Sequence, residues 1–423
     1  MMTSGAGASE KTILVGLEHG GVNRWDVEDS LDELRQLAAT AGANVIDTVV
    51  QRLDKPTAPY YIGKGKAEEV AAQCVEREVT SLIFDDELSP AQGRNLELLT
   101  SRKVIDRTQL ILDIFAQRAR TREGRLQIEL AQLQYLLPRL TRMWTHLSRQ
   151  SGGIGTRGPG ETQLEVDRRR VQERIARLER DLKEVRKNRG VQREGRLRRN
   201  WPVASLVGYT NAGKSSLLNR LTGAGVLAED KLFATLDPTT RQVMLPNNQK
   251  ILLTDTVGFI RKLPHTVIES FKATLEEVQL ADILIHIIDL SHPQYHEQMA
   301  AVDEALAELG AAGKQTILVF NKIDRVADRV IVNNQLERHP GSVCISARTG
   351  EGMDTLIGEL QVRLAAWRLR GEFRLPISES ALIAEMHRVG HVLDIRYEGD
   401  DAVIHAHVPP ELGARLAPYE SRA

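Results

Sequence analysis

Residues 205–215 read Ser-Leu-Val-Gly-Tyr-Thr-Asn-Ala-Gly-Lys-Ser, and this stretch decides the fold of the central part of the chain. The part after the apolar Leu-Val fits the pattern G-x-x-x-x-G-K-[ST], a phosphate-binding loop between a strand and a helix. In such a loop backbone N–H groups surround the phosphates, the lysine reaches the β- and γ-phosphates, and the serine hydroxyl ligates Mg²⁺. The residues expected to do this are Gly208, Tyr209, Thr210, Asn211, Ala212, Gly213, Lys214 and Ser215.

A second apolar strand, over 251–254, leads into the sequence Asp255-Thr256-Val257-Gly258. An acidic residue at the end of this strand is expected to face the Mg²⁺ shell, and the N–H of Gly258 can reach the γ-phosphate. This element therefore predicts the metal-facing side of the same site.

A third element is expected to select the base. The strand 316–320 leads into Asn321-Lys322-Ile323-Asp324, and the strand 343–345 ends at Ser346-Ala347-Arg348. The Asp324 carboxylate can accept the N1–H and 2-amino hydrogens of guanine, whereas adenine would leave it unpaired. Lys322 can lie along the base plane, and the N–H of Ala347 can meet the guanine O6. These elements, in this order, predict a GTPase and exclude an ATPase.

The segment between the phosphate loop and the second strand is a candidate switch. It contains several threonines, one of which must give its hydroxyl to Mg²⁺ when the γ-phosphate is present, and the residues alone leave Thr235, Thr239 and Thr240 open. Many small GTPases carry a water-orienting glutamine directly after the glycine of the Asp-x-x-Gly element. Here that position is Phe259, so intrinsic hydrolysis is expected to be slow unless a cation, another segment or a partner supplies the missing group.

Residues 11 to about 115 alternate between strand and helix patterns. Strands are expected at 12–15, 45–50, 81–84 and 103–105, with helices between them at 30–41, 66–78 and 91–101. This alternation predicts a parallel sheet covered on both faces.

The next segment carries two heptad seams, which begin at Leu126 and Leu164 and flank the glycine-rich run 152–160. Two amphipathic helices joined by a short loop should pair antiparallel to bury their seams. We therefore expect a helical hairpin, kinked at Pro138, with a glycine-rich tip that either packs closely against another backbone or simply connects the helices.

Charge and composition narrow the function further. The net charge is −1, but residues 116–200 contain 22 Lys/Arg against 10 Asp/Glu, so this segment has an excess of positive charge. A basic segment in an otherwise acidic chain indicates either an RNA partner or a solvated arginine-rich surface. The longest apolar stretch, 281–290, is too short to cross a membrane, and the two cysteines, Cys74 and Cys344, suit the cytosol.

The end of the chain reads as a small domain. A helix is expected at 380–389, followed by two strands at 392–397 and 402–407 around a turn at Gly399-Asp400.

These motifs together resemble the HflX family of translational GTPases, within the Obg–HflX group. The resemblance rests on the stretches 61–66, 152–165, 208–215, 233–241 and 255–259, and it covers residues 11–370. It favours Thr235 as the second protein ligand of Mg²⁺ beside Ser215. It also places the switch residues near the nucleotide: Phe233, Ala234, Thr235, Leu236 and Asp237. Lys214, Thr235 and Gly258 are then expected to take part directly in hydrolysis.

Residues 1–10 are small and polar and read as a disordered tail. The resemblance implies an α/β fold in four further parts: an N-terminal α/β domain (11–115), a coiled-coil hairpin (116–200), a P-loop GTPase domain (201–369) and a small α+β C-terminal domain (370–423). It implies a monomeric cytoplasmic GTPase that binds the large ribosomal subunit and its RNA, is stimulated by ribosomes, and separates stalled or idle ribosomes under stress. Two alternatives stay open, a ribosome-assembly GTPase and a regulatory switch with a protein partner. Some potassium-activated GTPases have a similar loop around Asn211, so K⁺ is a possible second cation.

Overall fold

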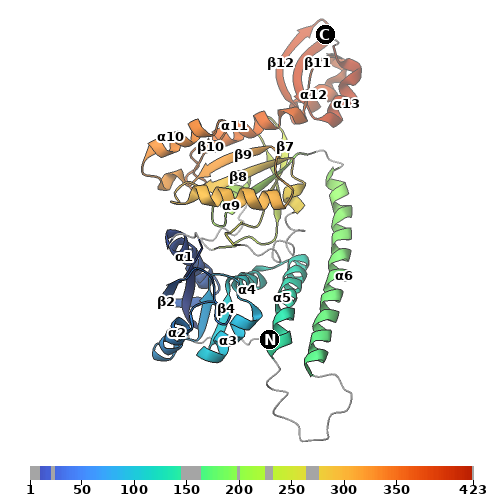
Figure 1. Cartoon of the computed structure of the whole chain (residues 1–423). Helices are drawn as coiled ribbons and strands as arrows, with labels where there is room; N and C mark the ends of the chain where they lie inside the picture. Colours follow the sequence, from blue (N-terminus) through green and yellow to red (C-terminus); the bar gives the residue numbers. More distant parts are fainter. Residues whose placement is uncertain are drawn as a thin grey trace. The chain divides into compact units, whose positions relative to one another are not determined.

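The computed structural model describes residues 10–20, 24–143, 163–197, 201–223, 232–262 and 276–421. The chain forms two compact units. Figure 1 shows the whole chain, coloured along the sequence from blue to red. The first contains residues 1–188, 229–237 and 260–273, and the second contains 189–228, 238–259 and 274–423. The two short segments 229–237 and 260–273, which flank residues 238–259, thus belong to the first unit, although the chain on either side of each belongs to the second.

The first unit is built on a parallel sheet with the order β2-β1-β3-β4. Its strands are β1 (Glu10–Glu18), β2 (Ala43–Arg52), β3 (Ser81–Phe84) and β4 (Lys103–Asp106). All four residues of β3 are buried, as expected of a parallel strand covered on both faces. The predicted parallel α/β fold is therefore confirmed.

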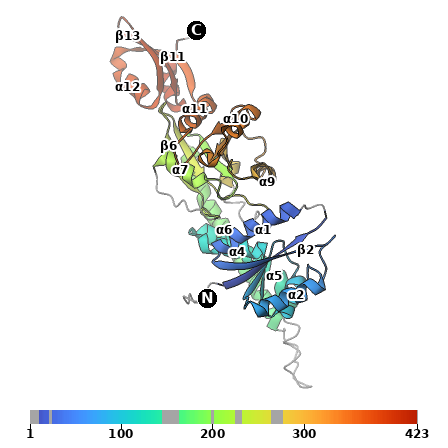
Figure 2. The same ribbon diagram turned by 90° about the vertical axis from the view of Figure 1, so that its left-hand side faces the viewer.

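Four helices cover this sheet: α1 (Arg24–Thr40), α2 (Lys64–Glu76), α3 (Pro90–Thr100) and α4 (Arg107–Arg118). Helix α1 packs against α4, and α2 packs against α3. Right-handed crossovers place these two pairs on opposite faces, and Figure 2 shows the sheet from a second side. The sequence patterns did not single out α4, whose buried residues lie all around it rather than along one stripe.

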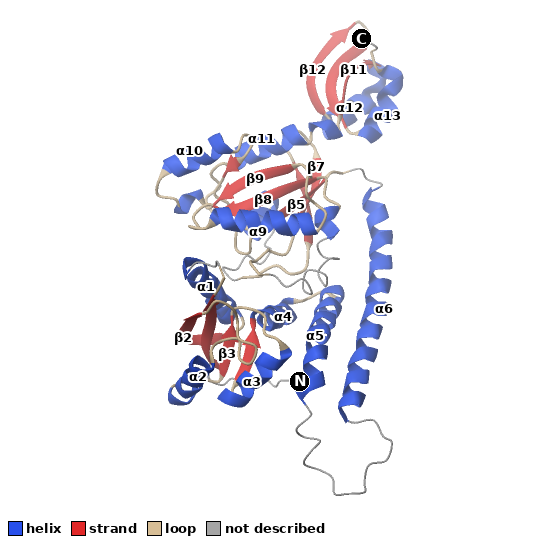
Figure 3. Ribbon diagram, in the orientation of Figure 1, coloured by secondary structure: helices blue, strands red, loops and turns tan. Residues whose placement is uncertain are grey.

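The helices α5 (Arg122–Met143) and α6 (Gln163–Leu197) follow, and Figure 3 shows them side by side. Arg174 of α6 pairs with Glu129 of α5 through two hydrogen bonds of 2.7 and 2.9 Å. Leu178 and Leu182 of the second seam are buried as expected. Pro138 lies inside α5, which continues through it, and the tip 152–160 lies outside the described residues.

The most deeply buried side chains of α5 differ from the predicted seam. Ile128, Ala131 and Tyr135 are buried, whereas Leu126 and Leu130 are only half-buried. The reason is tertiary: α5 packs against α3 and α4 of the N-terminal domain, so it has two apolar faces rather than one. The heptad pattern identified only the face that points away from that domain.

The second unit contains a six-stranded sheet with the order β10-β9-β8-β5-β7-β6, in which only β6 is antiparallel to its neighbour. The strands are β5 (Val203–Gly208), β6 (Thr239–Met244), β7 (Lys250–Asp255), β8 (Ile283–Asp289), β9 (Thr316–Asn321) and β10 (Val343–Cys344). The helices are α7 (Lys214–Thr222), α9 (Tyr295–Glu308), α10 (Arg329–Arg338) and α11 (Met353–Arg363). The carboxyl ends of β5, β7 and β9 meet at one edge, which is where ligands bind in open parallel sheets.

The C-terminal domain is a three-stranded antiparallel sheet with the order β11-β13-β12. It consists of β11 (Leu369–Pro376), α12 (Ser380–Val389), β12 (His391–Glu398), β13 (Asp401–Val408) and α13 (Pro410–Leu416). The prediction of a helix and two strands missed β11, because only Phe373 and Leu375 of that strand are buried. No helix in the described part of the chain is long and apolar enough to cross a bilayer.

Candidate nucleotide-binding site

The phosphate loop lies between β5 and α7, as the sequence pattern predicts. Gly213 has a φ of +102°, and a Cβ there would lie 2.2 Å from the side-chain nitrogen of Asn321. At Gly258 a Cβ would lie 2.7 Å from the Cα of Thr210 and 2.9 Å from the Nζ of Lys214. Both positions are therefore closed to any residue with a side chain, because the loops of the site approach one another at backbone distance.

Lys214 is buried at the first turn of α7. Its Nζ donates hydrogen bonds of 3.1 Å to the carbonyl of Gly208 and 2.7 Å to that of Tyr209. Burial, against the opposing charge of Asp255 and with a smaller contribution from the positive charge of Lys322, lowers the pKa of Lys214 to about 8. The loop thus holds an ammonium group whose charge lacks a full counter-charge, which a bound phosphate would supply.

Ser215 and Asp255 form the expected Mg²⁺ edge. The Ser215 hydroxyl donates a 2.6 Å hydrogen bond to the Asp255 carboxylate, which is fully buried. A hydroxyl and a carboxylate are the oxygen donors that Mg²⁺ accepts, so these residues fit the ion. The neighbouring Thr256 hydroxyl donates to the carbonyl of Leu206 at 2.6 Å and ties this segment to the central strand. Val257 is buried beside it.

The Asn321 side chain joins the base-selecting loops to the phosphate loop. Its amide nitrogen donates to the Ala212 carbonyl at 2.8 Å, and its amide oxygen accepts from the Ala347 N–H at 3.0 Å. Ser346 donates to the Asp324 carboxylate at 2.7 Å, and Ile323 is buried beneath it. The structure therefore brings the two base-selecting elements together around Asp324, while Arg348 follows in the exposed turn.

Lys322 has a φ of +63° and forms an ion pair of 2.7 Å with Asp289 at the end of β8. Asp289 has no distinctive motif around it, so sequence patterns did not single it out. Its position at the carboxyl end of a central strand is the one sequence signal that could have identified Asp289. Through the ion pair, Asp289 fixes the side chain of Lys322, which is expected to lie along the base.

The switch residues 232–237 pack within the first unit. The Phe233 ring meets the Phe115 ring edge to face, with centroids 4.6 Å apart, and Leu236 is buried. Ala234 and Thr235 are half-buried in the loop between them. The hydroxyl of Thr240 pairs with that of Thr254 at 3.0 Å, and Thr239 lies opposite Asp255 in the β6–β7 ladder.

The Asp237 carboxylate, expected beside the nucleotide, has partners at the start of helix α5. It accepts hydrogen bonds from the N–H of Arg120 at 2.8 Å and of Thr121 at 2.9 Å, and also from the Thr121 hydroxyl. A carboxylate at a helix N-terminus satisfies backbone donors that have no partner inside the helix, and it is favoured by the helix dipole. Sequence motifs give no sign of this contact, because its partners are more than a hundred residues apart.

The segment after Gly258 is held in a similar way. The Lys262 ammonium lies 2.5 Å from a carboxylate oxygen of Asp85 and 2.6 Å from one of Asp86, at the end of β3. Asp85 is itself paired with the buried Arg107 at 2.7 Å. Phe259, which stands in the usual glutamine position, is buried, and its carbonyl accepts a 2.7 Å hydrogen bond from the N–H of Thr210.

Comparison with known proteins agrees with this geometry. Family models described as "GTP-binding GTPase N-terminal", "GTP-binding GTPase Middle Region" and "50S ribosome-binding GTPase" match residues 28–116, 118–196 and 203–322. The GTPase HflX of Lacrimispora saccharolytica is 51% identical over 96% of both chains, and that of Escherichia coli K12 is 46% identical over 94% of this chain and 92% of its own.

Among solved structures, a GTP-binding protein from Sulfolobus solfataricus in complex with GDP is 25% identical, with a TM-score of 0.44 over 83% of this chain and 98% of that one. The fold and the site define a P-loop GTPase, an enzyme that binds and hydrolyses GTP. The chain belongs to the HflX family of GTPases.

The buried Lys214 predicts proton uptake on nucleotide binding. Its pKa is about 8 without nucleotide, and phosphate charge should raise it. Binding of GDP at pH 8.5 should therefore take up part of a proton, whereas binding at pH 7, where the lysine is already charged, should take up none at this position. Calorimetric titration in two buffers of different ionisation enthalpy measures this, and equal proton uptake at both values would contradict the assignment.

Asp324 should decide the choice of base. Asp324→Asn should weaken GTP binding by roughly a hundredfold or more, since two charge-assisted hydrogen bonds are lost. The variant should bind xanthosine triphosphate better, because the asparagine amide can donate to the 2-oxo group. Asp328→Asn is the matched control, since it changes the N-cap of α10 to an equally good cap. Competition assays that show the same base preference in both variants would refute the role of Asp324.

Proposed function

We propose that this GTPase binds the large ribosomal subunit through its RNA and uses GTP to separate stalled or idle ribosomes under stress. Membership of the HflX family and the match to a "50S ribosome-binding GTPase" model support the ribosome as partner. The observation that carries the RNA contact is an exposed arginine run on α6, Arg168–Arg170. The protein is proposed to act as a cytoplasmic monomer.

The arginines of this run are available to phosphates. Arg170 has a weak exposed pair within α6, with Asp167 at 3.7 Å. Such pairs are worth about 0–1 kcal/mol and exchange easily for phosphate contacts. Arg174, by contrast, is engaged with Glu129 and holds the two helices together. The exposed arginine run Arg168–Arg170 and the contact between α5 and α6 at Arg174 therefore involve different residues.

In hydrolysis, bound Mg²⁺ would neutralise charge that develops on the β- and γ-phosphates. Ser215 and Thr235 are proposed to ligate it, Asp255 to order its shell, and Lys214 to stabilise the same phosphate charge. The Gly258 N–H is proposed to position the γ-phosphate. Because Phe259 cannot orient the attacking water, the intrinsic rate of hydrolysis is proposed to be slow. The ribosome is proposed to supply the missing water-orienting group.

Coupling between the nucleotide and the hairpin is proposed to run through Asp237. This residue lies two positions after Thr235, the proposed Mg²⁺ ligand, and it accepts hydrogen bonds from Arg120 and Thr121, directly before α5. A shift of Thr235 on GTP binding would therefore alter how α5 begins. Lys262, four residues after Gly258, gives the second switch segment a corresponding contact with Asp85 and Asp86.

A ribosome-assembly role is the second candidate, because the exposed basic face would serve it equally well. Sedimentation of intact ribosomes with the protein and GTP separates the two functions. Ribosomes that fall into subunits support splitting, whereas an unchanged profile with bound protein supports assembly and contradicts the splitting role.

Potassium is proposed to assist hydrolysis through Asn211. This residue is exposed in the phosphate loop with a φ of +60°, and its amide oxygen can help to hold a monovalent cation near the β/γ bridge. Turnover should be faster in K⁺ than in Na⁺ at equal ionic strength, and Asn211→Ala should remove the difference. Equal rates of the wild type in both salts, on and off ribosomes, would leave Asn211 with only a hydrogen-bonding role.

Replacing Arg168, Arg169 and Arg170 by glutamine should weaken ribosome binding and flatten its salt dependence. Each lost phosphate contact should lower the slope of log affinity against log salt by roughly one. The control replaces three exposed basic residues of the N-terminal domain, Arg35, Lys64 and Arg77, by glutamine. It removes the same amount of positive charge as the test variant. Co-sedimentation with a non-hydrolysable GTP analogue gives both slopes, and identical slopes would place the RNA contacts elsewhere.

Thr121→Val should uncouple the hairpin from the switch. It removes the hydroxyl that donates to Asp237 and that also accepts the Gly124 N–H, whereas Thr121→Ser keeps both bonds. Stimulation of GTP hydrolysis by ribosomes should fall by on the order of fivefold in the valine variant and recover in the serine variant. Affinity for GDP should stay near that of the wild type. Full stimulation in the valine variant would show that the hydroxyl bond from Thr121 to Asp237 does not transmit the signal.

A further inference from the structure

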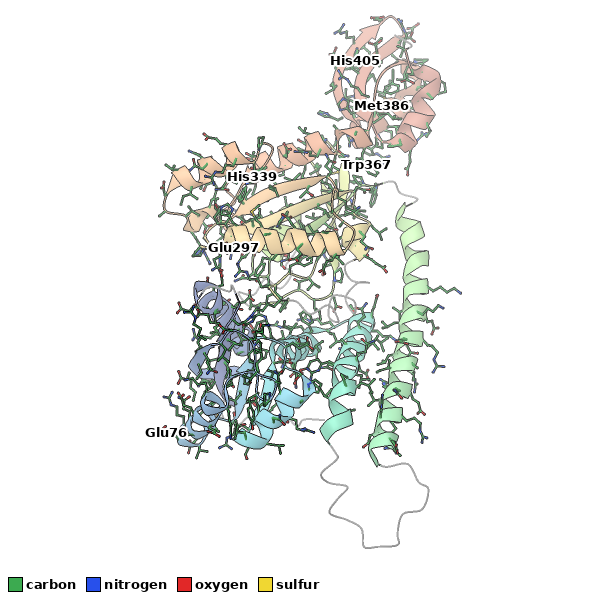
Figure 4. All side chains as sticks on the ribbon, in the orientation of Figure 1. Glu76, Glu297, His339, Trp367, Met386 and His405 are labelled. Atoms are coloured by element: carbon green, nitrogen blue, oxygen red, sulfur yellow. The ribbon has the colours of Figure 1, made fainter. Side chains whose placement is uncertain are left out.

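A pocket of about 370 Å³ lies inside the second unit, between the GTPase domain and the C-terminal domain. Its wall includes Trp201 and Lys250 from the GTPase domain and Trp367 and Arg368 from the junction between the two domains. Figure 4 labels Trp367 where the chain passes from α11 towards β11. None of the residues expected to bind GTP lines this pocket, so it is a separate feature of the molecule.

The walls of the pocket are held by hydrogen bonds across the junction. The Asn248 side chain donates to the carbonyls of His387 and Gly390 at 3.2 and 3.3 Å, and the Gln249 side chain donates to the Leu364 carbonyl at 3.2 Å. Gln249 is buried and connects β7 to the end of α11. The pocket is therefore built by specific contacts.

Arg368 is the unusual group in this wall. It is only 8% exposed, and its terminal nitrogens donate to the carbonyls of Asn247 at 2.9 Å, Val389 at 3.2 Å and His407 at 3.4 Å. Its Nε is buried and has no acceptor among the described residues. No carboxylate of the described residues pairs with Arg368. A buried guanidinium group with a free N–H and no counter-charge is costly unless an anion completes it.

The remaining charges around the pocket leave a positive excess. The other basic residues are Lys250, Arg388 and Arg415, and the acidic ones are Glu385 and Glu411. Arg415 and Arg388 already pair with Glu385, at 2.7 and 3.8 Å. Glu411 is exposed, so it does not compensate the buried Arg368. The pocket thus attracts a negative ligand at its buried end.

The other part of the wall suits a flat ring. Trp201 and Trp367 are half-buried, and Lys250 lies 5.3 Å from the centre of the Trp201 ring. Pro202, Pro409 and Pro410 add apolar surface. Indole rings stack on nucleobases of any identity. An acidic peptide side chain would pair with the Arg368 guanidinium group but would leave the tryptophan rings without a stacking partner. The volume is also within the range of small-ligand sites.

We propose that this pocket binds a nucleotide, with its phosphate at Arg368 and its base against Trp201 or Trp367. The ligand is either a free mononucleotide or an unpaired nucleotide of an RNA chain, which share this chemistry. The site is independent of the GTP site and of the proposed action on ribosomes, so it can be tested on the isolated protein.

The test uses the full-length protein saturated with GDP, so that the guanine site is filled. Adenosine monophosphate and a six-residue oligoadenylate are titrated separately by calorimetry, since Asp324 should reject adenine at the other site. Arg368→Gln should weaken binding by on the order of tenfold, because charge-assisted hydrogen bonds to phosphate are lost. Arg370→Gln is the control, since it makes the same change at an exposed position two residues further along, in β11 and outside the pocket.

Lys250→Gln and Trp201→Leu keep the test valid if Arg368→Gln does not fold, because both side chains line the pocket and neither is fully buried. Each should weaken the adenine ligand and leave GDP affinity unchanged. Binding of the mononucleotide identifies a small-molecule site, and binding of the oligonucleotide alone identifies an RNA contact. The proposal is overturned if the wild type binds neither adenine ligand, or if the pocket variants bind these ligands as the wild type does. It is also overturned if a hexaglutamate peptide binds the pocket in place of the adenine ligands.

Discussion

The side chain of Asn321 is the contact on which the nucleotide site depends. It donates to the phosphate loop at Ala212 and accepts from the guanine-selecting loop at Ala347, so one amide sets the spacing between them. The absence of a side chain at Gly213 makes this possible, since a Cβ there would occupy the position of the amide nitrogen. The loop expected to select the base and the phosphate loop are thereby linked through one side chain.

A second constraint follows from charge. Lys214 is buried with two carbonyl acceptors and a lowered pKa, and Asp255 is fully buried beside Ser215. Groups of this kind are stabilised when a phosphate and a divalent cation complete them. The segments 232–237 and 260–262 are anchored differently, through Asp237 at the start of α5 and Lys262 at Asp85 and Asp86. Nucleotide binding and the anchoring of the switch segments thus use separate residues.

Much of the fold could be predicted because each element carries its own local signal. The strand β3 and the helix α12 occur at the residues expected from hydrophobic patterning, since their neighbours in sequence define them. Helix α4 and strand β11 could not be predicted in this way. Helix α4 is buried on most sides, so its apolar residues do not form a stripe with the helical period. Strand β11 has only two buried residues, which is too few to show the alternation of a strand. The leucine seam of α5 was found, but its more deeply buried face depends on the domain that it packs against.

The amino-acid sequence by itself determined the chemistry of the GTP site. The phosphate loop, the acid expected to face the metal and the aspartate expected to select guanine each lie in a short motif, and local spacing specifies these motifs. Only the tertiary structure decided which distant groups meet: Asp289 with Lys322, Asp237 with Thr121, Lys262 with Asp85, and Arg368 with carbonyls from three segments. Such pairs come from the packing of whole elements, and a chain folded differently could carry the same motifs without them. Motifs therefore identify the reaction, while the long-range contacts depend on the whole fold.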